Sequence, residues 1–134
     1  MLSTILASCI ALSTSYYSLP PDALPRLRAL EGGWTGLAKP NTNGSADLGV
    51  FQINTTWLKT FRIYWQLDSD QAAYARLRDD DCYSASAAGA VLRYNLQLTG
   101  GDLDKAIGFY HTGPRGSAKE AARYIAKYHA LSSR

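Results

Sequence analysis

The chain has 134 residues, of which 46% are hydrophobic and 19% charged, and its net charge is +3. A chain of this length folds as one domain with a substantial core, and this composition excludes disordered, collagen-like and low-complexity proteins. No apolar stretch is long enough to span a membrane. The positive charge gathers in residues 105–134, which carry six basic side chains and one acidic side chain. This excess suits an anionic partner such as a cell-wall polymer, although a solvated basic helix face would look the same.

Apolar residues predict a helix over residues 3–17, and a break follows at residues 18–21. The letters "LASC" that end at Cys9 are similar to a lipoprotein cleavage box, but no basic residue precedes them. We therefore interpret this stretch as a helix of the folded domain and leave open whether a signal segment was trimmed from it. Asp22 is placed to cap a second helix that ends at Glu31, because two glycines follow.

Turn-forming residues predict a polar loop over residues 32–46, and residues 47–61 predict a turn leading into a short helix. Further helices are expected over residues 68–77, 83–98 and 102–110, the last of them capped by Asp102. Ser117 and Glu120 form a capping-box pattern for a final helix to about His129. No series of strands, repeat or linker is found. We predict one all-α domain over residues 1–134.

Several kinds of enzymatic site are excluded by the residues present. His111 and His129 are far apart and in no metal-ligand motif, and the chain has no serine-hydrolase elbow, P-loop or dinucleotide fingerprint. The acidic run at residues 78–81 fits a solvated helix end better than a cation site. We predict no metal and no cofactor. Cys9 and Cys82 leave one disulfide or two thiols equally open.

Glu31 is the residue that suggests chemistry. Leu24, Leu27 and Glu31 are spaced by three and four residues, so they share one face of the predicted helix. The leucines indicate that this face is buried, and the negative end of the helix dipole lies at Glu31. Burial and the dipole both raise the pKa of a carboxyl group, as a general acid near neutral pH requires. A structural acid paired with an arginine is the alternative.

Three stretches, "ALEGG", "GSADLGVFQINTTWL" and "GGDLDKAIGFYHTG", resemble in order and spacing the signature blocks of the soluble lytic transglycosylases. The small members that accompany type III and type IV secretion or conjugation machines are the most similar. The likeness extends from about Cys9 to beyond His111. It implies a lysozyme-like all-α fold of the goose type with a glycan groove. It also implies cleavage of peptidoglycan between N-acetylmuramic acid and N-acetylglucosamine, with a 1,6-anhydro product.

The resemblance assigns roles to particular residues. Glu31 corresponds to the single catalytic acid and base, and Tyr110 to a residue that hydrogen-bonds near its carboxylate and holds it in place. Gln52 corresponds to a residue that binds the sugar next to the cleaved bond, with Asn54 close by, and Gly49 lets the backbone approach the glycan. Phe51 and His111 occupy two further groove positions. The cysteine placement also matches, which implies a Cys9–Cys82 disulfide and an oxidising, periplasmic setting.

The sequence departs from the family pattern at three positions. Gly32 replaces a serine that could orient the glutamate, Phe51 replaces methionine, and His111 replaces an asparagine that contacts sugar. Asp47 is the only acid of the loop region that could act as a second carboxylate, and a cap on the turn at Leu48 and Gly49 is its alternative and favoured role.

The sequence leaves three functions to compare. The first is a lytic transglycosylase that opens the wall for a secretion or conjugation apparatus; the others are a goose-type lysozyme-like hydrolase and a non-catalytic peptidoglycan-binding assembly module. The expected partners are glycan strands and machinery proteins, and the expected state is a monomer. Nucleic acid is not expected, because no reading motif is present. Lys119, Arg123 and Lys127 form a basic stripe at four-residue steps that suits either anionic peptidoglycan or a partner protein.

Overall fold

Regular structure in the computed structural model, which describes residues 3–131, consists of seven α-helices, one short 3-10 helix and a three-stranded sheet. The helices are α1 (Thr4–Tyr16), α2 (Ala23–Glu31), α3 (Leu58–Tyr64), α4 (Asp70–Asp79), α5 (Asp81–Leu98), α6 (Leu103–Thr112) and α7 (Ala118–Leu131), and the 3-10 turn is Thr55–Trp57. The mostly helical class is as predicted. No helix within the described part is long and apolar enough to cross a membrane.

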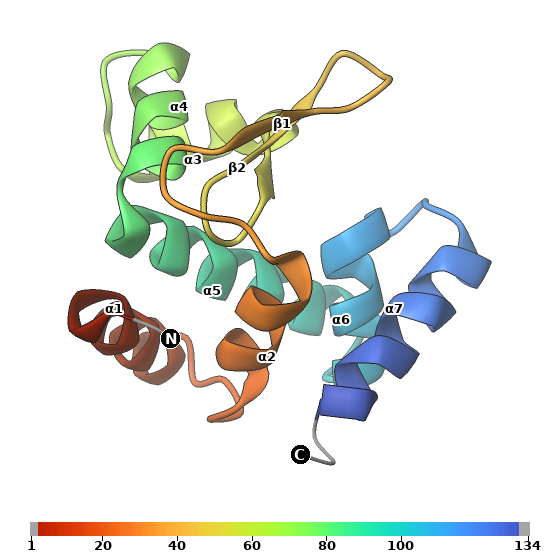
Figure 1. Cartoon of the computed structure of the whole chain (residues 1–134). Helices are drawn as coiled ribbons and strands as arrows, with labels where there is room; N and C mark the ends of the chain where they lie inside the picture. Colours follow the sequence, from red (N-terminus) through yellow and green to blue (C-terminus); the bar gives the residue numbers. More distant parts are fainter. Residues whose placement is uncertain (1–2, 132–134) are drawn as a thin grey trace.

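Helix α5 runs through the middle of the molecule, with α3 and α4 at one end and α6 and α7 at the other (Figure 1). Its buried face is built of small residues, among them Ala85, Ala88 and Gly89. This allows α1 to pack very closely, because a Cβ added to Gly89 would lie only 2.1 Å from the Ser13 hydroxyl oxygen. The Ser13 hydroxyl donates to the Ala85 carbonyl at 2.8 Å. The N-terminal stretch is therefore an integral helix of the core, as expected.

Two of the three expected side-chain caps are present. Asp102 accepts from the Lys105 amide at 3.1 Å, and Ser117 accepts from the Glu120 amide at 3.2 Å. Asp22 is the exception, because its side chain makes no capping hydrogen bond at the start of α2. Its backbone has helical rather than extended angles, and its carboxylate pairs with Arg26 instead.

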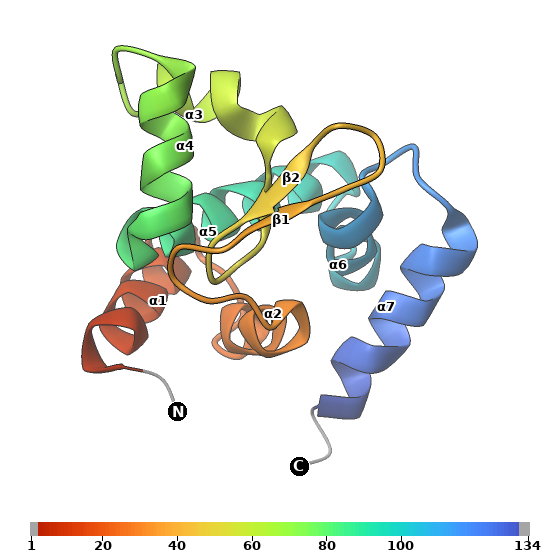
Figure 2. The same cartoon turned by 45° about the horizontal axis from the view of Figure 1, so that its top comes forward.

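The predicted loop over residues 32–46 is wrong in part, because it contains strands. Strands β1 (Ala38–Pro40) and β2 (Ala46–Leu48) form an antiparallel hairpin, and β3 (Ile53–Asn54) pairs with β2. The turn formers between β1 and β2 make the hairpin connection. Strands of two or three residues are too short to show the alternating pattern by which a strand is detected in sequence. Figure 2 shows the hairpin extending between the α3–α4 pair and α6.

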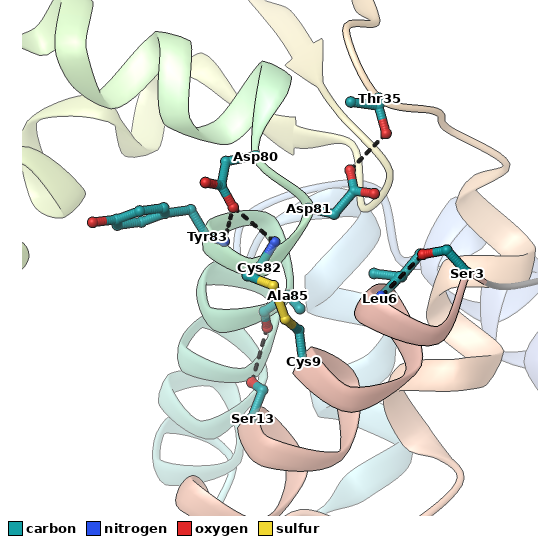
Figure 3. The surroundings of a disulfide bond; sticks show 10 residues. All are labelled: Ser3, Leu6, Cys9, Ser13, Thr35, Asp80, Asp81, Cys82, Tyr83 and Ala85. Atoms are coloured by element: carbon teal, nitrogen blue, oxygen red, sulfur yellow. Dashed lines mark hydrogen bonds between the residues drawn. A yellow bond between two sulfur atoms is a disulfide. The ribbon is translucent and has the colours of Figure 1, made fainter.

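Cys9 of α1 and Cys82 of α5 form a disulfide, so the pairing implied by the resemblance is confirmed. Figure 3 shows how the first turn of α5 is fixed around this bond. The Asp80 carboxylate caps α5 by accepting from the Cys82 and Tyr83 amides at 3.0 and 3.1 Å. Asp81 accepts from the Thr35 hydroxyl at 2.7 Å. The N-terminus of α5 is thus tied both to α1 and to the segment after α2.

Candidate functional site

A cavity of about 680 Å³ lies between the sheet, α5, α6 and the end of α2. Its polar lining is rich in side-chain amides, from Asn41, Asn43, Gln52, Asn54 and Asn95. Its ionisable residues include Glu31, Lys39, Asp47 and His111, and its aromatic residues include Trp57, Tyr94 and Tyr110. Cavities that bind small molecules have this size. Amides and partly exposed rings suit a ligand with many hydroxyl groups, such as a sugar.

Glu31 is the last residue of α2, as predicted. The helix stops there because Gly32 follows with left-handed backbone angles, a conformation that glycine adopts without strain. The next residue, Gly33, packs against the sheet so closely that a Cβ on it would lie 2.1 Å from the Gly49 carbonyl oxygen. The helix end is therefore held against the turn between β2 and β3, with Glu31 lining the cavity.

The Glu31 carboxyl group has a strongly raised pKa. Burial away from water is the main cause and raises the pKa to about 7. The charge of Asp47 acts in the same direction, while a hydrogen bond from the Tyr124 hydroxyl and the charge of Lys39 act against it. No arginine is among the groups that shift this pKa. Glu31 can consequently carry a proton near neutral pH and release it.

Tyr124 of α7 holds the Glu31 side chain, and sequence reasoning missed it. Its hydroxyl donates to Glu31 Oε2 at 2.5 Å, and burial with the nearby carboxylate raises the tyrosine's own pKa far above its ordinary value. The expected partner, Tyr110, instead donates to the Phe51 carbonyl at 3.0 Å. The only signal in the sequence was the four-residue spacing of Tyr124 and Tyr128, which puts them on one face of a helix. In the structure that face of α7 is buried.

The residue at the family's asparagine position, His111, also lines the cavity. Its ring stacks on the ring of Tyr124, with 4.6 Å between centroids and an angle of 5° between planes. His111 therefore lies beside the residue that holds Glu31, and it remains exposed to an incoming ligand. His111 therefore lines the same cavity as Glu31, and its expected contact with sugar stays a prediction.

Lys39, Asp47 and Asn54 form a row across the three strands. Lys39 of β1 lies directly opposite Asp47 of β2 in the strand register, and Asp47 lies directly opposite Asn54 of β3. Paired residues of antiparallel strands point to the same face, and all three line the cavity. Asp47 does not cap the turn that follows it: its carboxylate accepts from the Asn54 side-chain amide at 2.9 Å, and the Gly49 amide donates to the Leu37 carbonyl at 2.9 Å instead. The favoured role as a cap is therefore wrong, and a second carboxylate faces the cavity.

The other residues of the central motif have mixed outcomes. Gln52 lines the cavity, and its amide donates to the Gly49 carbonyl at 3.0 Å. Phe51 is fully buried in the core, so it is not a ligand contact. Gly49 is not among the cavity-lining residues; a Cβ there would lie 2.3 Å from the Leu77 carbonyl oxygen, so its small size accommodates α4 rather than a ligand.

Three acidic side chains outside the cavity have structural roles. In the run at residues 78–81, Asp79 pairs with Arg78 at 2.7 Å, and Asp80 and Asp81 make the contacts around α5 described above. Within residues 3–131, no group of three or more His, Cys, Asp or Glu side chains could hold a metal ion.

Comparison with known proteins adds nothing to the geometry, since no protein-family model and no curated protein sequence matches the chain. The chemistry of the site must therefore be inferred from its residues. It contains an acid that is half-protonated near neutral pH, a second carboxylate held by an amide, and a lining suited to sugars.

Proposed function

We propose that the protein is a peptidoglycan lytic transglycosylase that cleaves the β-1,4 bond between N-acetylmuramic acid and N-acetylglucosamine. The observation that supports this most is Glu31, a partly buried acid that lines a sugar-sized cavity and whose pKa is raised to about 7. The similarity of three sequence blocks to that family supports the same reaction. Gln52, Asn54, Tyr110 and His111 lie around the cavity where a glycan would bind.

In this reaction Glu31 acts twice. It first gives its proton to the glycosidic oxygen, so the bond to the leaving N-acetylglucosamine breaks while the 2-acetamido group of the substrate stabilises the developing positive charge. The Glu31 carboxylate then takes the proton of the muramic acid 6-hydroxyl, and that oxygen closes the 1,6-anhydro ring. Glu31 ends protonated, and no water is consumed. Both steps need a carboxyl group with a pKa near the working pH.

Tyr124 and Asp47 would support these steps without exchanging protons. The Tyr124 hydroxyl keeps Glu31 Oε2 in a fixed place, so the other carboxyl oxygen is left to face the glycosidic bond. The Asp47 carboxylate would stabilise the positive charge that develops on the sugar ring. Its hydrogen bond from the Asn54 side-chain amide would hold the carboxylate in place for this role.

Hydrolysis of the lysozyme type is a second candidate, and Asp47 is the observation that favours it. Glycosidases that add water commonly use two carboxyl groups on either side of the bond. Glu31 and Asp47 are close enough for the charge of Asp47 to raise the pKa of Glu31. Asp47 could then act as a nucleophile, or as a base for water, while Glu31 acts as the acid.

Digestion of purified peptidoglycan sacculi separates these functions. Soluble products analysed by mass spectrometry should be lighter than hydrolysis products by one water, and they should be absent with Glu31→Gln. Products with ordinary reducing ends, lost in Asp47→Asn, would favour hydrolysis. Binding to sacculi without any soluble product, from the wild type and from Glu31→Gln alike, would favour a non-catalytic binding module.

The same proposal places the protein outside the cytoplasm, where it would open the wall locally for a secretion or conjugation apparatus. The Cys9–Cys82 disulfide supports this setting, because structural disulfides persist in oxidising compartments. Its partners would then be glycan strands and proteins of that apparatus. The expected monomeric state is tested by light scattering of the purified protein.

A further inference from the structure

Lys39 is the only lysine or arginine among the residues that line the cavity in the described part of the chain. It lies at the outer end of the three-residue row, on β1, with its neighbours Asp47 and Asn54 extending inward across the sheet. Its side chain is exposed. A positive charge in a groove otherwise lined by amides, rings and acids is a feature that a neutral glycan would not need.

The Lys39 ammonium group is not neutralised by an ion pair in residues 3–131. Arg26, Arg62 and Arg78 each have a carboxylate within 4.0 Å, but Lys39 has none. Asp47, its direct cross-strand neighbour, is engaged by the Asn54 amide instead. The ammonium group thus remains available to a ligand.

We propose that Lys39 is a specificity residue that binds a carboxylate group carried by the glycan. This inference rests on the proposed function and names the part of the substrate that the groove recognises. In peptidoglycan the muramic acid sugars carry a lactyl ether at the 3-position, which ends in a carboxylate or continues into a stem peptide with carboxylates of its own. Polymers of N-acetylglucosamine carry neither group, so Lys39 would distinguish the two kinds of glycan.

Charge balance in the groove supports this role. Asp47 faces Lys39 from β2, and its carboxylate would repel a substrate carboxylate. Glu31 would add to this repulsion once it has given up its proton. A muramic acid residue could approach these acids only if a cation offset the repulsion nearby. Lys39 is placed to do so, because it lies directly opposite Asp47 on the neighbouring strand and its charge already acts on Glu31.

The test compares glycan strands with and without their carboxylates. Soluble strands stripped of peptides by an amidase are used as they are, or after carbodiimide coupling to methylamine, which makes every lactyl carboxyl neutral. Peptide-bearing strands are treated in the same two ways, so the lactyl group and the stem peptide are distinguished as sources of the carboxylate. The measured quantity is kcat/KM for the wild type, Lys39→Met and Lys39→Arg.

We expect Lys39→Met to lower kcat/KM about tenfold on the strands whose carboxylate is bound, because a hydrogen bond to a charged group is lost. On the methylamide strands the same variant should show only the shift of the pH profile that follows from losing the Lys39 charge near Glu31, without the tenfold loss. Lys39→Arg should restore most of the preference. Lys59→Met is the matched control, since Lys59 is an exposed lysine of α3 that does not line the cavity. Raising the salt concentration should reduce the wild-type preference.

A different role for Lys39 would give a different result. If Lys39 acts only by lowering the pKa of Glu31, Lys39→Met will shift the pH profile equally on all four substrates, and the inference is wrong. If the wild type cleaves none of them, the proposed reaction fails, and the inference is then judged by binding. Calorimetry with the Glu31→Gln variant should show about tenfold weaker binding of carboxylate strands when Lys39→Met is added; equal binding would overturn it.

Discussion

At the scale of single residues, the state of Glu31 results from opposing effects. Burial at the end of α2 makes the ionised form unfavourable, and the neighbouring charge of Asp47 adds to this. The Tyr124 hydroxyl and the charge of Lys39 favour the ionised form, so the pKa stops near 7 instead of rising further. An acid that gives a proton and later takes one back needs this intermediate value.

The first prediction concerns the stability of Glu31→Gln. Because folding raises the pKa of Glu31 from 4.5 to about 7, the wild type loses stability as the pH rises through this range. Glutamine does not titrate, and its carbonyl oxygen can still accept from Tyr124. We compare the free energy of unfolding of the variant with that of the wild type. The difference, variant minus wild type, should be larger at pH ~8 than at pH ~4 by up to roughly 3 kcal/mol. Urea unfolding at both pH values measures this.

A constant difference between the two proteins at all pH values would contradict the raised pKa. Glu120→Gln provides the control. Glu120 is a partly exposed residue of α7 paired with Arg123, and it does not line the cavity. Its replacement should change stability by less than ~1 kcal/mol at either pH.

A second prediction concerns Tyr124→Phe. Removing the hydroxyl removes a hydrogen bond that favours the Glu31 carboxylate, so the pKa of Glu31 should rise by about one unit. NMR titration of the Glu31 side-chain carboxyl carbon measures this shift directly. The alkaline limb of kcat/KM should move upward by the same amount, while kcat falls because the carboxyl group is less firmly placed.

Tyr128→Phe is the matched control for this prediction. Tyr128 lies one turn further along α7, and its hydroxyl does not bond to Glu31. The titration of Glu31 should be unchanged in this variant. If both substitutions shift the titration equally, the cause is looser packing of α7 and not the hydrogen bond.

At the scale of elements, the site depends on how α2 meets the sheet. Gly33 approaches the Gly49 carbonyl, and Gly49 in turn approaches the Leu77 carbonyl of α4, so neither position can accommodate a Cβ without movement of the backbone. These two contacts connect α2, the β2–β3 turn and α4. They place Glu31 and Asp47, which belong to different elements, on one cavity.

The third prediction is that Gly33→Ala destabilises the protein by about 2–3 kcal/mol, because the new Cβ would lie 2.1 Å from the Gly49 oxygen. Gly32→Ala isolates this contact. A Cβ at position 32 would have no neighbouring atom within 4 Å, so this variant carries only the strain of a left-handed backbone. It should lose only ~1 kcal/mol of stability. Equal losses for the two variants in thermal unfolding would show that α2 and the sheet can separate freely at this point.

At the scale of the whole molecule, α5 organises the fold. It contacts α1, α4 and α6, while α7 packs against α6 and α2 and carries Tyr124 to Glu31. The site therefore combines residues 93 positions apart in sequence. The disulfide lies on the side of α5 that faces α1, and it stabilises the framework rather than the cavity.

The fourth prediction follows from the disulfide, whose cysteines are separated by 73 positions in sequence. Opening so large a loop increases the entropy of the unfolded chain, so Cys9→Ala with Cys82→Ala should lose about 2–4 kcal/mol of stability. Urea unfolding measures this loss, and reduced wild-type protein should show a similar value. The pKa of Glu31 should not change. A double variant as stable as the oxidised wild type would contradict the prediction.

Local features of the sequence determined the helices and the place of Glu31. Caps such as Asp102 and Ser117, and the stop at Gly32, act through neighbours in the chain, so they can be read without the fold. The position of Gln52, Asn54 and His111 beside the glutamate was expected from the resemblance, and the cavity contains all three. The Cys9–Cys82 pair followed from the resemblance in the same way.

Only the tertiary structure decided which side chains meet across the chain. The hydrogen bond from Tyr124 to Glu31 spans 93 positions, and the row of Lys39, Asp47 and Asn54 exists only because three very short strands pair in one register. The same turn buries Phe51 and directs Gln52 to the cavity. Such contacts depend on the packing of distant elements, whose energies are not encoded in any local pattern. The sequence thus places the acid, and the fold sets its pKa and its neighbours.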